Sequence, residues 1–133
     1  NQNTLSWDDL RALHKAGVTI AAHSHTHPIL TQIPPEEARQ EIRTSQQCIQ
    51  SEIGSALPIF AYPDGKPRAF NREVMQVLAS EGFELAFVML PGRSDLQPQN
   101  LLKIPRNDIW DTMSLAQFHF NLTPSRELFL KFK

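Results

Sequence analysis

The sequence predicts a single α/β domain with a mostly parallel sheet, because short apolar runs alternate with segments of helical pattern along its 133 residues. The helical segments are long enough to be the crossovers that parallel strands require. Polar clusters also follow directly after two of the apolar runs. In parallel α/β folds the ligand site lies at the carboxyl ends of the strands, so we expect both clusters to face one site.

The first half of the chain predicts a helix, a strand and a second helix. Ser6 with Asp9 three residues later is a capping-box pattern, so a short helix should begin there and end before Gly17. Residues 18–22 are all β-branched or apolar, which is typical of a strand covered on both faces. The next helix should begin at Pro34 and Pro35, where proline and acidic residues are favourable, and residues at helical spacing extend it to a glycine at position 54.

The second half repeats this alternation. Residues 57–62 predict a strand that ends in the turn-forming sequence of residues 63–67. Asn71 is the expected N-cap of a third helix, which should end at Gly82. Residues 83–90 and 101–104 predict two further strands, and residues 114–133 predict a helical end with a break at Pro124.

Composition excludes several classes of protein and site. The net charge is −1, and the 13 basic residues are spread along the chain, so we expect no nucleic-acid partner. Cys48 is the only cysteine, which excludes an internal disulfide and a cysteine-rich zinc site. No run approaches 18 apolar residues, so no transmembrane segment is predicted.

The most informative motif is His23-Ser24-His25-Thr26-His27-Pro28, which places three imidazoles directly after an apolar run. Imidazole is the commonest metal ligand in proteins, so the motif predicts a metal site. His23 and His27 would be roughly 13 Å apart in an extended strand, and therefore need a tight turn to share an ion. One helical turn ended by Pro28 would achieve this, because proline restricts His27 to extended geometry. Alternatively, His23 and His25 share a strand face and can chelate while extended.

With this motif and the later Phe60-Ala61-Tyr62-Pro63-Asp64-Gly65 turn, the chain resembles polysaccharide deacetylases with a NodB-homology domain, carbohydrate esterase family four. The resemblance runs from about residue 5 to residue 120. It implies a partial, distorted (β/α) barrel and a hydrolase that removes N-acetyl groups from an amino-sugar polysaccharide. It also implies a bacterial protein of the cell envelope, which is exported, periplasmic or located at the cell surface.

The resemblance assigns roles to individual residues. His23 and His27 correspond to two protein ligands of a divalent ion, most favourably zinc, while Ser24 and Pro28 support the motif and His25 is a variable position. The ion would polarise the acetamide carbonyl and activate a bound water. The backbone N–H of Asp64 corresponds to the donor that stabilises the resulting oxyanion.

Three further residues are candidate substrate contacts: Tyr62, Pro63 and Arg106, which lie at or just after the ends of predicted strands. Tyr62 has the alternative of packing in the core, and Arg106 that of an ordinary salt bridge. The side chain of Asp64 has two interpretations of its own, an acid–base or ligand role and a simple turn residue.

Parts of the family pattern are missing. The Thr-Phe-Asp-Asp type motif, which supplies the family's catalytic base and third metal ligand, does not occur, and Asp8-Asp9 lie in a predicted helix instead. The arginine of the family's third motif, which usually braces the catalytic aspartate, corresponds to Ala61 in this chain. The family's terminal Leu-X-His motif is not evident either. We therefore expect residues 1–133 to form one deacetylase-like domain that is incomplete at its N-terminus compared with the family's domain.

These observations predict a metal-dependent carbohydrate N-deacetylase that binds an N-acetylated polysaccharide or oligosaccharide. Two alternatives stay open. One is another metal-dependent amidohydrolase that uses His23 and His25. The other is a non-catalytic carbohydrate-binding domain, which is favoured by the missing base.

Overall fold

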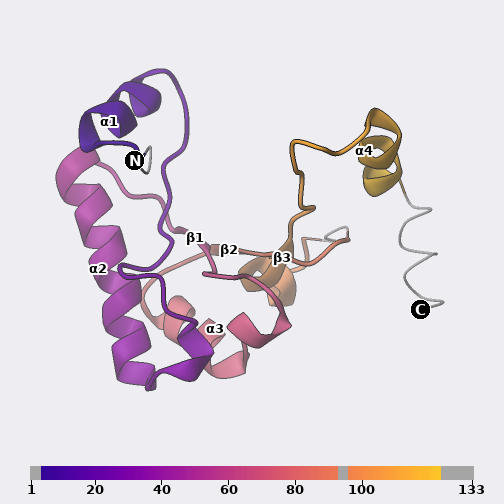
Figure 1. Cartoon of the computed structure of the whole chain (residues 1–133). Coiled ribbons are helices and arrows are strands. Elements are labelled where there is room, and N and C mark those ends of the chain that lie inside the picture. Colours follow the sequence, from indigo (N-terminus) through magenta and orange to yellow (C-terminus); the bar gives the residue numbers. More distant parts are fainter. Residues whose placement is uncertain (1–3, 93–95, 124–133) are drawn as a thin grey trace.

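The computed structural model describes residues 4–92 and 96–123, and its centre is a parallel sheet (Figure 1). The strands are β1 (Ile59–Ala61), β2 (Leu85–Val88) and β3 (Ile104–Pro105), in the order β1-β2-β3. Phe60 pairs with Ala86, and Phe87 pairs with Ile104. The mixed α/β class with parallel strands is therefore confirmed, and a partial barrel fits this open sheet.

The helices begin and end close to the residues that the sequence indicates. They are α1 (Trp7–Lys15), α2 (Pro35–Ile53), α3 (Arg72–Ser80) and α4 (Leu115–Leu122), with short 3-10 helices η1 (Leu30–Gln32), η2 (Pro67–Ala69) and η3 (Pro98–Lys103). Ser6 and Asp9 form the expected capping box, and the Asn71 side chain accepts from the Val74 N–H. Gly54 ends α2 in the left-handed conformation. Local signals thus specify these helix boundaries.

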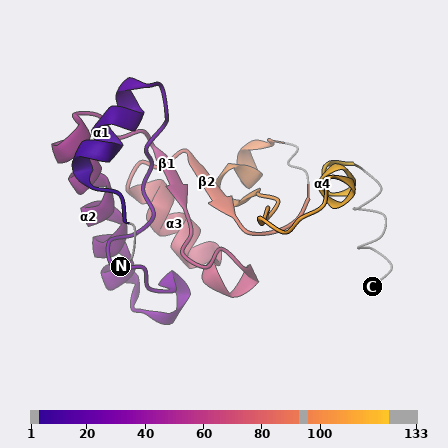
Figure 2. The ribbon, with the colours of Figure 1, turned by 45° about the horizontal axis from the view of Figure 1, so that its top comes forward.

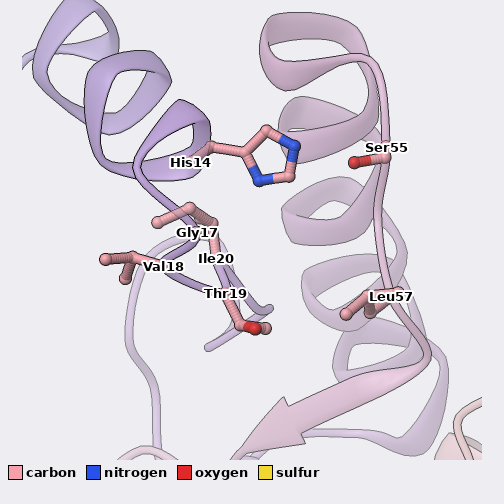
Figure 3. Close-up of a pocket in the computed structure, with 7 residues that line it drawn as sticks. All are labelled: His14, Gly17, Val18, Thr19, Ile20, Ser55 and Leu57. Atoms are coloured by element: carbon pink, nitrogen blue, oxygen red, sulfur yellow. The ribbon is translucent and has the colours of Figure 1, made fainter.

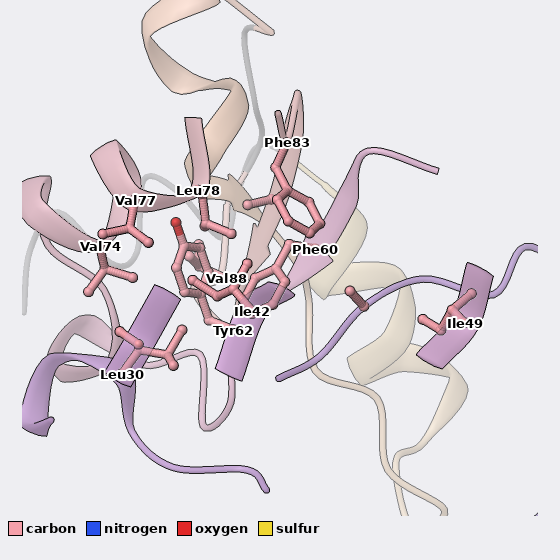
Figure 4. Packing of buried hydrophobic residues seen from close by; sticks show 13 residues of the cluster. Leu30, Ile42, Ile49, Phe60, Tyr62, Val74, Val77, Leu78, Phe83 and Val88 are labelled. Atoms are coloured by element: carbon pink, nitrogen blue, oxygen red, sulfur yellow. The ribbon is translucent and has the colours of Figure 1, made fainter. Parts of the chain in front are cut away.

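The core lies between one face of the sheet and the apolar faces of α2 and α3 (Figure 4). Alternate strand residues are buried, as the period of two requires, and Phe60 is fully buried. Its ring meets the rings of Tyr62 and Phe83 edge to face, each at a centroid distance of 5.5 Å. Ile42 of α2 and Leu78 of α3 are fully buried beside it. This packing fixes α2 against the strand ends that carry the candidate site.

Two predicted strands are wrong. Residues 18–22 form no regular strand, and only Ala22 makes a sheet contact, a parallel bridge to Phe60. Val18 is exposed, and its N–H donates to the Leu13 carbonyl at the end of α1 and not to a neighbouring strand. Residues 101–104 belong mainly to η3, and only Ile104 enters a strand. Pro98 favours a helical first turn there, so an apolar run was not sufficient to predict a strand.

The C-terminal part extends away from the layered body. Both views place α4 apart from the sheet and from α2 and α3 (Figure 1 and Figure 2). Its Ser114 capping box confirms the predicted start, whereas the predicted continuation past Pro124 lies outside the described residues. Within the described residues, no helix is long and apolar enough to cross a membrane.

Candidate active site

The histidine loop, residues 23–28, lies at the carboxyl end of β1 and brings two imidazoles together. The rings of His23 and His27 are 4.9 Å apart between centroids and meet edge to face at 70°. His25 makes no such ring contact in the part of the chain that the structure describes. The tight turn expected between His23 and His27 is therefore present.

The turn is not the single helical turn that the spacing suggested. Ser24 and His27 have φ values of 61° and 65°, which lie in the left-handed region. Pro28 therefore does not hold His27 in extended geometry, contrary to the prediction. The Ser24 hydroxyl accepts a hydrogen bond from the His27 N–H at 3.1 Å and closes the turn. Two left-handed residues reverse the chain within this short loop and bring the rings together.

The orientation of His23 is set by the neighbouring strand. Its Nδ1 lies 2.7 Å from the Ala61 carbonyl oxygen at the end of β1. A carbonyl only accepts, so Nδ1 carries the proton and Nε2 keeps its lone pair in the neutral ring. Desolvation lowers the pKa of His23, the bond to Ala61 opposes this, and the charges of His27 and Arg106 lower it further. The neutral, metal-binding form is thus favoured at neutral pH.

Helix α2 supports the histidine loop from behind, through two side chains that the sequence did not single out as site residues. The Ser45 hydroxyl accepts from the His23 N–H at 3.2 Å. The Glu41 carboxylate accepts from the N–H groups of His25 and Thr26 at 2.9 and 2.7 Å. Glu41 and Ser45 are four residues apart, and so lie on one side of the helix. This spacing of four residues was the sequence signal that could have identified Glu41 and Ser45 as residues that support the loop.

The donor set fits part of a zinc site. Two neutral imidazoles can fill two of the four positions of a tetrahedral zinc ion, at about 2.0–2.1 Å each. Catalytic zinc commonly has three protein ligands. Among residues 4–92 and 96–123, no group of three or more His, Cys, Asp or Glu side chains is arranged to hold a metal.

Asp64 lies in the turn after β1, three residues beyond Ala61. Its carboxylate accepts from the Arg68 Nε at 2.9 Å and lies 3.7 Å from the Lys66 Nζ. The hydrogen bond from Arg68 holds the pKa of Asp64 below its usual value. Its backbone N–H finds no acceptor among the described residues, since the turn bond runs from the Gly65 N–H to the Pro63 carbonyl. The peptide N–H rather than the carboxylate is therefore the group available to a ligand.

Tyr62 and Pro63 are buried at the end of β1. Tyr62 is 1% exposed, and its hydroxyl donates to the Leu102 carbonyl at 2.8 Å. Burial raises the pKa of this phenol. Of the two interpretations that the sequence left open for Tyr62, the geometry supports packing in the core for the side chain.

Arg106 follows β3, and its backbone N–H donates to the Val88 carbonyl at 2.9 Å. Its side chain is exposed and makes no ion pair within the described part of the chain, so the salt-bridge alternative finds no support there. Its positive charge contributes to the lowered pKa of His23.

Two hollows differ in their relation to these residues. An open hollow of about 480 Å³ borders the loop and is lined by His23, His25, Trp7 and neighbouring residues of α1 and α2. A smaller cavity of about 110 Å³ lies at the opposite end of residues 18–22, between His14 and Leu57 (Figure 3). Because ligand sites of parallel sheets lie at the carboxyl ends of the strands, the first hollow and not the second belongs to the candidate site.

Residues 1–86, more than half of the chain, match the polysaccharide deacetylase family. This chain belongs to that family. The match spans the histidine loop and the turn after β1, the two segments that form the candidate site. No curated protein sequence matches the chain.

Solved structures share the fold of this family member. The Streptococcus pyogenes deacetylase PplD in complex with acetate has a TM-score of 0.79 and 22% identity, over 93% of this chain and 53% of that one. BA0330 from Bacillus anthracis also has a TM-score of 0.79 and 22% identity, over 92% of this chain and 38% of its own. The deacetylase domain of BpsB from Bordetella bronchiseptica has a TM-score of 0.66 and 24% identity, over 77% and 48%. The chain spans about half or less of the length of these structures.

Proposed function

We propose that this protein is a metal-dependent hydrolase that removes N-acetyl groups from an amino-sugar polysaccharide. Membership of the polysaccharide deacetylase family supports the reaction class. The proposal of a metal rests on one observation: the ring centroids of His23 and His27 are 4.9 Å apart, and Nδ1 of His23 is hydrogen-bonded to the Ala61 carbonyl. This arrangement leaves Nε2 of His23 free for the ion.

In this proposal each residue of the site has one task. His23 and His27 hold a divalent ion, most favourably zinc, which supplies polarisation of a carbonyl and activation of a water molecule when bound. The Asp64 N–H donates a hydrogen bond to the oxygen that becomes negative as the amide is attacked. Arg106 attracts a polar or anionic part of the substrate, because its side chain is exposed and directly follows β3, at the carboxyl end of the sheet. Tyr62 and Pro63 shape the floor of the site from the core.

The metal proposal is tested with three variants: His23→Ala, His27→Ala and His25→Ala. We expect the first two to lose bound zinc and the release of acetate from an N-acetylated oligosaccharide, and His25→Ala to retain both. Zinc content after dialysis is measured by atomic emission, and acetate release by a coupled enzymatic assay. Loss of zinc in His23→Ala and His25→Ala, with His27→Ala unaffected, would favour the other amidohydrolase. Absence of zinc from every form would exclude both hydrolases.

A non-catalytic carbohydrate-binding domain is the second candidate. It is favoured by one observation, that no third metal-binding side chain joins His23 and His27 among the described residues. Binding of an N-acetylated oligosaccharide by the zinc-loaded protein, without release of acetate, would support it.

We further propose that residues 1–133 belong to one deacetylase-like domain, which acts at the cell envelope of a bacterium. The buried core that runs from Ala22 to Val88 supports one folding unit for the layered body of the chain. The bacterial origin of the structures with the same fold supports a bacterial source, and the family's polysaccharide substrates support a location at the envelope. Fractionation of the source organism, with detection of the protein by antibody, tests this.

A further inference from the structure

Glu41 makes an unusual set of contacts with the histidine loop. Its Oε2 accepts from two consecutive backbone N–H groups, those of His25 and Thr26, at 2.9 and 2.7 Å. Its Oε1 accepts from the Thr26 hydroxyl at 2.8 Å. Burial acts to raise the pKa of Glu41, but the bonds from Thr26 and His25 together leave it lower than usual. Both carboxylate oxygens of Glu41 thus bind the part of the loop that lies between His23 and His27.

The loop depends on such contacts, because it has no regular secondary structure of its own. Ser24 and His27 both have left-handed φ values, and this conformation costs roughly 1–2 kcal/mol for each L-residue. A loop with this strain keeps one conformation only if the surroundings impose it. The backbone N–H groups of the loop donate to Ser45, Glu41 and Ser24. Of these three acceptors, only Glu41 is charged, and bonds to charged acceptors are about twice as strong.

We propose that Glu41 is a positioning residue for the histidine pair. By binding the His25 and Thr26 N–H groups, its carboxylate sets the separation of His23 and His27 and thereby the affinity of the site for a divalent ion. The effect on affinity rests on the proposed function, in which this pair binds the ion. Glu41 touches neither ring, so it acts through the loop backbone.

The chain provides a matched control. Glu37 lies one helical turn earlier in α2, is exposed and makes no hydrogen bond to the loop. Glu41→Ala and Glu37→Ala remove the same charge and the same atoms from the same helix. Only the first removes the acceptor of the loop N–H groups. Thr26→Val and Thr26→Ser form a second pair, since only valine removes the hydroxyl bond to Glu41.

The first measurement is the affinity for Zn²⁺ by competition with a chromophoric chelator. Loss of a residue that orients a metal ligand typically weakens binding about 10- to 100-fold, which is the result expected for Glu41→Ala. Thr26→Val should weaken binding to a lesser degree, whereas Thr26→Ser and Glu37→Ala should leave it unchanged. An unfolding temperature lowered equally in Glu41→Ala and Glu37→Ala, with unchanged Zn²⁺ affinity, would overturn the proposal. If Glu41→Ala does not fold, the two Thr26 variants decide.

The second measurement does not depend on metal. Amide hydrogen exchange in the metal-free protein, followed by NMR, should be faster at His25 and Thr26 in Glu41→Ala and unchanged in Glu37→Ala. If His23→Ala binds Zn²⁺ as the unmodified protein does, the proposed function fails, and amide exchange still tests whether Glu41 positions the loop. If His23→Ala loses Zn²⁺ but Glu41→Ala does not, the proposed function stands and this inference is overturned.

Discussion

Replacement of Gly65 by alanine should destabilise the turn that carries Asp64. Gly65 has a φ of 64°, so an L-residue there costs roughly 1–2 kcal/mol. A Cβ would also lie 2.8 Å from the Met89 backbone nitrogen, which already donates to the Gly65 carbonyl at 2.7 Å. Relief of this overlap displaces backbone, at a cost of about 1–3 kcal/mol. We therefore expect Gly65→Ala to lower the free energy of unfolding by about 2–5 kcal/mol.

Gly54→Ala is the control that isolates the overlap. Gly54 has a φ of 85°, but a Cβ there meets no heavy atom within 4 Å, so only the backbone cost of roughly 1–2 kcal/mol applies. Urea unfolding followed by circular dichroism should give a midpoint for Gly65→Ala at least about 0.5 M below that of Gly54→Ala. Acetate release should fall in Gly65→Ala, because the Asp64 N–H moves, and persist in Gly54→Ala. Equal midpoints for the two variants would refute the argument from the close approach to Met89.

Two further predictions concern a salt bridge and a buried hydroxyl. Arg43 binds Glu81 through two hydrogen bonds of 2.9 Å, and Arg39 pairs with the same carboxylate, so Glu81→Gln should cost about 1–3 kcal/mol in urea unfolding. The hydrogen bond from Arg43 is the main cause of the lowered pKa of Glu81. The ionised Glu81 carboxylate therefore stabilises the fold fully above its unfolded-state pKa, and this stabilisation is lost as the pH falls through its folded-state pKa. Glu81→Gln should lose less stability than the unmodified protein on acidification. Tyr62→Phe removes the hydrogen bond to the Leu102 carbonyl and should cost about 1–2 kcal/mol. Its KM for an N-acetylated oligosaccharide should be unchanged, whereas a raised KM would show that the Tyr62 hydroxyl contacts the sugar.

The helices could be predicted well because their limits are set by residues close in sequence. The Ser6 and Asn71 side chains bond to N–H groups three residues later, and the start of α2 follows from its prolines. Such signals need no knowledge of the rest of the fold. The parallel arrangement also followed from the alternation of element types, since the connecting helices allow few other topologies.

The strands were harder to predict, because an apolar run does not reveal what covers it. Residues 18–22 look like a buried strand, yet only Ala22 pairs with β1, through the Ile59 carbonyl and the Ala61 N–H. Strand pairing depends on residues distant in sequence, so local composition decides it only in part. The same limit applies to residues 101–104, where the i to i−3 hydrogen bonds of η3 replaced the expected strand.

In the histidine motif, the candidate metal ligands could be predicted from the sequence, but the contacts that position them could not. Its spacing identified which imidazoles could meet, but not that left-handed residues would bring them together, nor that α2 would position them. Helix α2 makes three kinds of contact: its apolar residues and Ser45 are buried in the core, Glu41 bonds to the loop, and Arg43 bonds to Glu81. Ser45 and Glu41 thus bond to the loop, whereas Arg43 bonds to Glu81, just beyond the end of α3. A polar pair at positions i and i+4, with one member inside the apolar stripe and the other next to it, is therefore a usable sign that a helix supports a neighbouring loop. Because the loop and the end of α3 are both bonded to side chains of α2, a displacement of this helix would disturb both sets of bonds. The position of the histidine pair is thus fixed by the packing of the core as well as by its own sequence.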